Sequence, residues 1–281
     1  MTRTKRNLII IGSIVGFFVL LAVVFGALFS LRGIQVDYRS ADLRNEYLYL
    51  EDDIIEDADI KMRKNILFID VDESEERLEQ KYPYARFEIV RNFPNKLVIY
   101  VYKREAVFKV ENSQGNYEIY DRDLKCLEVV GNIGMTDKQK AIPVLKGFDV
   151  DLCGLAGNFM QNPTLLDKMG TIVDGVYAVG ATNINGLMSN IVFGYDEENG
   201  FDTLVLQTKH GSIISIQDTT SNFYGKVADA TKIYVVDIAQ DPYYTSKLNE
   251  VRILVKKNYD KNNLTDIGAN MIIVYPEKGS V

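Results

Sequence analysis

The sequence predicts an α+β protein that has an apolar N-terminal helix, a small β-α-α-β-β domain and a mixed, mainly antiparallel β domain with flanking helices. Three observations predict this fold class. Residues 8–31 form an apolar run, residues 65–107 contain a helix and then a hairpin pattern, and short alternating segments separated by turn residues fill most of the rest. The expected boundaries are a tail at 1–7, a transmembrane helix at 8–31, a first domain at 32–105 and a second at 106–281.

The apolar run has the length of a membrane span. As a helix its 24 residues would extend about 36 Å, enough to cross a hydrocarbon core of about 30 Å with some tilt. A cleaved signal peptide is the alternative, but its apolar region would be shorter and would end in a small-x-small site. The preceding Arg3, Lys5 and Arg6 favour a cytoplasmic N-terminus, so we expect a single-pass anchor with its C-terminal domains outside the membrane.

Composition is that of a folded protein, at 47% hydrophobic and 25% charged residues. The net charge is −7, and without the three basic residues of the tail the chain carries 29 basic and 39 acidic residues, a net −10. Such an acidic body argues against nucleic acid as a partner, because phosphate binding needs clustered Lys and Arg. Cys126 and Cys153 leave one disulfide possible, although Cys126 lies in a strand-like run where a free thiol packs as a small hydrophobe.

The first domain is expected to begin with a strand at 34–38 and a helix at 47–65. Six acidic residues crowd residues 51–59 of that helix. They could form a cation site, but they lack the loop spacing and the Gly of a calcium site. We favour the other interpretation, in which the carboxylates face the positive end of the helix dipole.

Residues 65–107 carry the clearest local pattern in the chain. Asp72 is the expected N-cap of a helix, with Glu75 as its capping-box partner, and Pro83 is expected to end that helix. Residues 85–91 then alternate, residues 93–96 are a turn, and residues 97–102 alternate again. The pattern predicts a helix followed by a β-hairpin.

This stretch resembles the POTRA domain of the bacterial division proteins FtsQ and DivIB. The sequence differs from the family at two positions. It has Ala106 where the family usually has Pro, and Tyr84 where the family usually has Val or Ile. The resemblance implies a POTRA domain over 32–105 and an FtsQ-type β domain over 106–281. The motif residues that carry it are Asn65, Asp70, Leu78, Pro83, Arg91, Pro94, Leu97, Arg104 and Glu105.

In the second domain we expect two short strands within 108–130, a family-like segment at 142–147 and a short helix from Asn162. Strands are expected at 191–195, 203–208 and 212–217, with a hairpin turn at 209–211. A helix at 224–235 contains Lys226. A second helical pattern at 246–258 precedes a last strand at 270–275.

We find no catalytic constellation. His210 is the single histidine and lies in an expected turn, the two cysteines lack the second pair that a zinc site needs, and no Gly-rich loop has phosphate-binding spacing. The expectation is therefore a protein without enzymatic activity, metal or cofactor.

The resemblance implies a bitopic scaffold protein of the divisome at the septum. Such a scaffold couples divisome assembly to septal wall synthesis. Its implied partners are FtsB/DivIC-like and FtsL-like bitopic division proteins, bound partly through the last strand. The residues of that strand are Met271, Ile272, Ile273, Val274 and Tyr275. An open strand edge can accept another strand. The alternative is that Ile272 and Val274 simply face the core and that the edge of the last strand is covered.

Two other functions stay open. One is a membrane-anchored extracytoplasmic enzyme that acts on the cell wall. The other is a POTRA protein of an export pathway, although such proteins carry several POTRA repeats or a membrane β-barrel, and the chain shows neither pattern.

Overall fold

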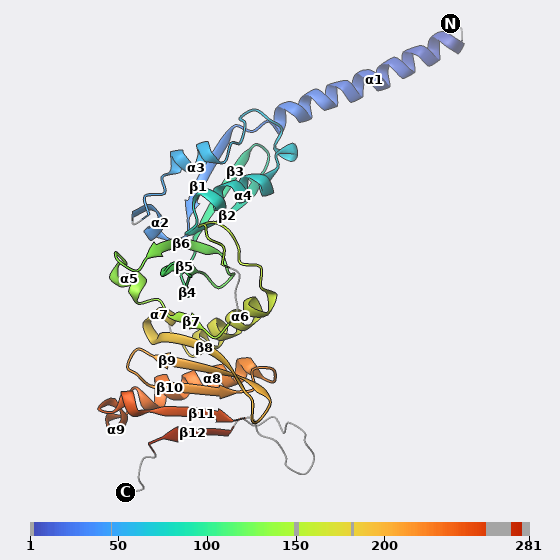
Figure 1. The fold of residues 1–281 in the computed structure, drawn as a ribbon. Coiled ribbons are helices and arrows are strands. Elements are labelled where there is room, and N and C mark those ends of the chain that lie inside the picture. Colours follow the sequence, from blue (N-terminus) through green and yellow to red (C-terminus); the bar gives the residue numbers. More distant parts are fainter. Residues whose placement is uncertain (1–2, 46, 149–151, 181–182, 257–270, 277–281) are drawn as a thin grey trace. The chain divides into compact units, whose positions relative to one another are not determined.

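The computed structural model describes residues 3–45, 47–148, 152–180, 183–256 and 271–276, with side chains from residue 12 onward except that of Met271. The chain forms two compact units, Met1–Arg104 and Glu105–Val281 (Figure 1). Each unit has its own hydrophobic core. The fold is α+β, with a small three-stranded sheet in the first unit and a large mixed sheet in the second.

The first unit begins with helix α1, Arg3–Leu28. Among the helices that the structure describes, none is both long enough and apolar enough to span a membrane. The membrane span expected at 8–31 stays a prediction.

The remainder of the first unit follows the expected β-α-α-β-β order, with one short extra helix. The three strands lie in the order β1-β3-β2, with β1 parallel and β2 antiparallel to β3. The elements are β1 (Gly33–Tyr38), α2 (Ala41–Asn45), α3 (Glu51–Asp57), the 3₁₀ turn η1 (Ile66–Phe68), α4 (Val71–Lys81), β2 (Ala85–Asn92) and β3 (Lys96–Lys103).

The hairpin pattern is confirmed residue by residue. Phe87 and Ile89 of β2 are buried and alternate with exposed neighbours, and Leu97 and Ile99 of β3 are completely buried. These side chains form one core with α3 and α4. Leu31, just after α1, is also fully buried in that core.

Two helix predictions in this unit are wrong in detail. The helix expected at 47–65 is confined to α3, because Asp59 and Arg63 adopt positive φ angles (48° and 66°) that a helix does not contain. Helix α4 begins two residues early, since its N-cap is Asp70, whose carboxylate accepts the Glu73 N–H at 3.2 Å. Asp72 lies inside the first turn, where its charge suits the helix dipole.

The second unit is built on a nine-stranded sheet in the order β12-β11-β10-β9-β8-β7-β4-β5-β6 (Figure 1). Five of its pairs are antiparallel, and the pairs β10–β11, β4–β7 and β7–β8 are parallel. The strands are β4 (Phe108–Glu111), β5 (Asn116–Tyr120), β6 (Cys126–Gly131), β7 (Val144–Lys146), β8 (Met188–Asp196), β9 (Phe201–Thr208), β10 (Ile213–Gln217), β11 (Arg252–Lys256) and β12 (Met271–Tyr275).

Helices α6 (Pro163–Tyr177) and α8 (Phe223–Lys232) pack together beside this sheet. Their backbones approach closely at Gly175, where an added Cβ would lie 2.8 Å from Val227 Cγ1. Asn162 caps α6 as expected, by accepting the Leu165 N–H at 3.0 Å, but the helix is longer than predicted. The smaller helices are α5 (Asp137–Lys140), α7 (Ile184–Leu187), the π-helical turn η2 (Ile233–Ile238), α9 (Pro242–Thr245) and the 3₁₀ turn η3 (Leu248–Glu250).

The helix predicted at 246–258 is wrong. Its described part holds η3 and strand β11, which pairs in parallel with β10. Val251, Ile253 and Val255 are buried and alternate with more exposed residues, so the period of two decides the structure here. Residues 108–130 contain three strands rather than two.

Candidate partner-binding edge

Strand β12 ends the large sheet. Its antiparallel partner is β11, with Ile253 opposite Val274 and Arg252 opposite Tyr275. Within the described residues no strand lies on its other side. Ile272 and Val274 pack against the hydrophobic core, so the intervening Ile273 and Tyr275 face away from it, and Tyr275 is 46% exposed. Among the described residues, β12 thus presents an open backbone edge with an apolar outer face.

The opposite end of the sheet is partly covered. The N–H and C=O of Cys126, the first residue of β6, bond to Asn158 O (2.8 Å) and Gly157 N (2.7 Å). The segment at 157–158 therefore occupies the place that a further strand would take beside the start of β6.

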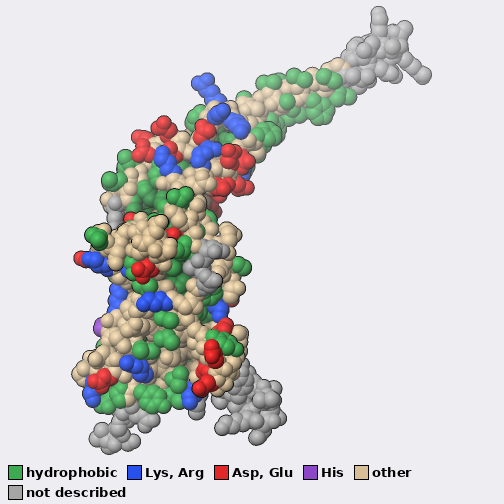
Figure 2. Space-filling view, viewed as in Figure 1, with side chains coloured by type: hydrophobic (Ala, Val, Ile, Leu, Met, Phe, Trp, Pro, Cys, Tyr) green, Lys and Arg blue, Asp and Glu red, His purple; other side chains and the backbone are tan. Residues whose placement is uncertain are grey.

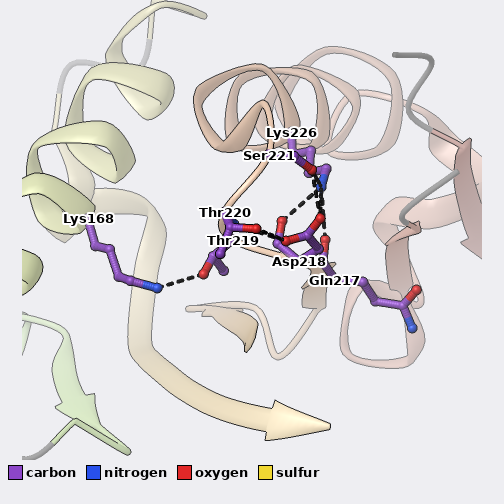
Figure 3. Close-up of polar contacts among 7 residues, drawn as sticks. All are labelled: Lys168, Gln217, Asp218, Thr219, Thr220, Ser221 and Lys226. Atoms are coloured by element: carbon purple, nitrogen blue, oxygen red, sulfur yellow. Dashed lines mark hydrogen bonds and ion pairs between the residues drawn. The ribbon is translucent and has the colours of Figure 1, made fainter. Parts of the chain in front are cut away.

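A buried polar cluster lies at the turn between β10 and α8, two strands from the edge (Figure 3). Lys226 Nζ donates to the backbone oxygens of Asp218 (2.8 Å) and Gln217 (3.1 Å). It also lies 3.9 Å from the Asp218 carboxylate, and both side chains are 2% exposed. The buried ammonium and carboxylate compensate each other's loss of hydration.

The Asp218 carboxylate also organises the turn itself. It accepts the Thr220 N–H at 3.1 Å and the Ser221 hydroxyl at 2.7 Å, while Asp218 holds a positive φ of 57°. From another direction, Lys168 of α6 donates to the Thr219 hydroxyl at 2.6 Å (Figure 3). The cluster ties α6 and α8 to the end of β10.

The Ser221–Lys226 pair resembles the Ser–Lys arrangement of some hydrolases, with Nζ 3.4 Å from Oγ. A lysine that acts as a general base must be neutral and must accept the hydroxyl proton. Here the Ser221 hydroxyl donates to Asp218, and Lys226 donates to two carbonyl oxygens. This geometry stabilises the charged ammonium, so the pair suits a structural role.

The other reactive side chains are also occupied or buried. His210 Nδ1 lies 3.1 Å from the Tyr234 hydroxyl. Cys126 and Cys153 are free thiols, and burial raises the pKa of Cys126 to about 12. Among the described residues, no group of three or more His, Cys, Asp and Glu side chains could hold a metal ion.

The POTRA motif residues that sequence analysis singled out hold the first unit together. Asn65 caps η1 by accepting the Leu67 N–H at 3.0 Å, and Asp70 caps α4. Arg91 donates to the carbonyl oxygens of Ile66 (3.1 Å), the first residue of η1, and of Ile69 (2.8 Å), which follows η1. The remaining motif residues Leu78 and Leu97 are fully buried, Pro83 follows α4, Pro94 lies in the hairpin turn, and Glu105 opens the second unit.

Arg104 has a different role, at the outer edge of β2. Its guanidinium donates to the Ala85 carbonyl at 3.3 Å and to the Glu79 carboxylate at 3.0 Å. Glu79 in turn accepts the Phe87 N–H at 3.4 Å, and Glu75 accepts the Ile89 N–H at 2.5 Å. Four backbone groups of this edge strand are therefore occupied, because Ala85 also donates its N–H to Tyr82 O at 2.9 Å.

Sequence analysis missed this closed edge and assigned Glu75 to a capping box. Glu75 and Glu79 are spaced i, i+4, which places both on one face of α4, and that spacing was the available signal. The pKa of Glu75 is raised, mainly by burial and further by the charges of Asp72, Glu79 and Glu88, against the lowering effect of the Ile89 N–H. β2 is thus closed by its own unit, whereas β12 is open among the described residues.

These features define a protein with a POTRA domain and a separate mixed-sheet unit that ends in an edge strand. Residues 48–104 match the family model described as POTRA domain, FtsQ-type. This match supports, over the first domain, the resemblance to the FtsQ/DivIB family of bacterial division proteins. A comparison of the chain with curated proteins returns no match.

Proposed function

We propose that the protein is a bitopic scaffold of the divisome that binds other division proteins outside the membrane and couples divisome assembly to septal wall synthesis. The observation that carries the proposal is the FtsQ-type POTRA domain, followed by a second unit whose last described strand ends its sheet. The protein belongs at the division septum in this account, with a cytoplasmic N-terminus.

The apolar character of α1 supports a membrane anchor. In the described part of the helix, large apolar side chains are about half exposed or more, including Ile14 (51%), Phe18 (63%) and Val23 (64%). Hydrophobic side chains cover the side of this helix that Figure 2 shows. A helix that is apolar all round is stable only when it is buried, and a bilayer is the environment that suits it. The 24-residue apolar run has the length for this role.

The partners in this proposal are FtsB/DivIC-like and FtsL-like bitopic division proteins. An extended partner segment would pair with β12 through main-chain hydrogen bonds and would cover Ile273 and Tyr275 on the outer face. The POTRA edge strand β2 is a poorer acceptor, because Glu75 and Glu79 already bond to its N–H groups. The contrast between the two edges favours β12.

The protein acts without catalysis in this account. Lys226 is engaged as a donor to two backbone carbonyl oxygens, which suits a structural role. The competing proposal of a wall-active enzyme predicts turnover of cell-wall substrates by the full chain. The export proposal predicts binding of unfolded outer-membrane substrates.

The binding proposal is tested with the full chain in lipid nanodiscs and the FtsB/DivIC-like and FtsL-like proteins of the same organism. We expect the I273K/Y275K variant to bind at least about tenfold more weakly, because lysine on an edge strand opposes strand addition. Y195K is the matched control, since Tyr195 is an exposed (61%) tyrosine on β8, inside the sheet. Equal binding by the wild type, I273K/Y275K and Y195K would contradict binding through the β12 edge. No binding by the wild type would contradict the choice of these partners.

A further inference from the structure

The segment at residues 61–68, with the sequence KMRKNILF, combines exposed apolar side chains with cations. Phe68 is 74% exposed, Met62 51% and Leu67 47%. Lys61, Arg63 and Lys64 are exposed between them. None of these side chains contributes to the POTRA core, which Ile66 alone of the segment enters.

Backbone hydrogen bonds tie this segment directly to the end of α1. Leu31 donates its N–H to Lys64 O (2.9 Å) and accepts the Arg63 N–H (3.0 Å). The Ile66 N–H reaches Phe29 O at 2.8 Å. The residues that follow α1 are therefore paired with 63–66, and the segment lies at the level where the helix ends.

The hairpin turn of the POTRA sheet contributes another exposed apolar side chain near the end of α1. Phe93 is 55% exposed, and its ring packs edge-to-face on Phe29 with centroids 6.0 Å apart. Phe29 in turn stacks on Phe25 of α1 at 5.5 Å. The apolar surface of the helix thus continues without interruption onto the POTRA domain.

The cations of the segment are available to an external anion. In the part of the chain that the structure describes, no ion pair involves Lys61, Arg63 or Lys64. The nearest acidic residues in sequence have other bonds, since Asp59 lies 3.6 Å from Arg77 and Asp70 caps α4. Three exposed cations on an otherwise acidic chain mark this segment as a local positive site.

We propose that the 61–68 segment docks on the anionic lipid surface where α1 leaves the bilayer. Phe68, Leu67 and Met62 would insert at the level of the headgroups, while the three cations would contact lipid phosphates. This inference rests on the proposed membrane anchor. It adds a second attachment, which would restrict how the POTRA domain tilts about the end of α1.

The lack of tryptophan in the chain makes a direct test possible. The full chain carrying F68W as its single indole is reconstituted into phosphatidylcholine vesicles with about 30% phosphatidylglycerol and brominated acyl chains. L48W is the matched control, because Leu48 is an equally exposed (70%) POTRA residue outside the segment. We expect the F68W indole to be quenched at least about threefold more than the L48W indole, since interfacial side chains lie within about 5–10 Å of the acyl boundary.

The charges are tested by K61Q/R63Q/K64Q on the F68W chain and by vesicles of phosphatidylcholine alone. We expect either change to reduce the quenching at least about twofold, because each cation near an anionic surface contributes to binding. Chain that floats with the vesicles while both indoles show equal lipid quenching would overturn the docking but leave the anchor intact. Chain that does not float with the vesicles would overturn both.

Discussion

At the scale of single residues, the POTRA domain depends on side chains that bond to backbone groups or to one another across elements. Asp57 of α3 accepts hydrogen bonds from Lys81 (2.6 Å) and from the Tyr82 hydroxyl at the end of α4. Arg91 and Arg104 serve the backbone around η1 and at the β2 edge. The hydrogen bonds that these polar side chains make within the fold therefore account for their chemical identity.

Asp57 gives the fold a defined pH dependence. Burial raises the pKa of Asp57, but the hydrogen bonds from Lys81 and Tyr82 and the Lys81 charge outweigh it, so the pKa is lowered. A lowered folded-state pKa means that the stabilisation is present above the unfolded value of about 3.9 and is lost as pH falls through the folded value. We expect D57N to lower Tm at pH 7 and the difference from wild type to shrink below about pH 4.

Thermal melting of residues 29–281, a fragment that keeps Leu31 in the POTRA core, measures this effect. D52N is the control, because Asp52 is exposed in the first turn of the same helix. A Tm difference for D57N that is the same at every pH would show that the carboxylate charge does not matter.

At the scale of elements, the edge strands β2 and β12 differ in what bonds to their outer backbone groups. The N–H groups of Phe87 and Ile89 are bonded to carboxylates of α4, so β2 resists strand addition in the way that natural edge strands commonly do. β12 carries no such caps among the described residues, and its outer face holds Ile273 and Tyr275.

The Glu75 cap is tested by amide hydrogen exchange at Ile89. We expect exchange to be about tenfold faster in E75A, because a hydrogen bond to a charged group contributes about 1.5–3 kcal/mol. E75Q keeps an acceptor oxygen and should retain most of the protection. E76A, which removes an exposed carboxylate from the same helix, should exchange like the wild type. Equal rates in all four proteins would show that the edge is protected by something other than Glu75.

The turn between β10 and α8 also depends on side-chain contacts. K226M leaves the buried Asp218 carboxylate without its counter-charge, so we expect a loss of about 3–5 kcal/mol in the free energy of unfolding. Urea denaturation of residues 29–281 measures it, with K232M, an exposed lysine of the same helix, as control. A loss below about 1 kcal/mol would mean that the pair contributes little to the turn.

At this scale the sequence predicted some elements and not others, for physical reasons. The hairpin at 85–103 was predictable because alternation and the Pro-Asn turn agree. Strand β11 was not, since Leu248, Val251, Leu254 and Val255 also fit a helix, and only pairing with β10 decides between the periods. The N-cap of α4 was displaced because Asp-x-x-Glu occurs at both 70–73 and 72–75.

The same limit applies to the candidate site. The position of the last strand could be read from its apolar run, but its place at the end of the sheet follows from strand order, which is a property of the whole unit. The buried Lys226–Asp218 pair and the carboxylate caps on β2 join residues that are 8 to 14 positions apart. The i, i+4 spacing of Glu75 and Glu79 places both on one face of α4, but no local pattern specifies which backbone groups they contact.

At the scale of the whole molecule, the proposed scaffold consists of an apolar helix, an FtsQ-type POTRA domain and a mixed sheet whose edge strand β12 is open among the described residues. The central claim is that this scaffold works at the division septum. An N-terminal fluorescent fusion of the full chain, imaged in dividing cells of the source organism, tests that claim most directly. The account predicts a mid-cell band that appears as the septum forms, and a uniform rim that persists through division would contradict it.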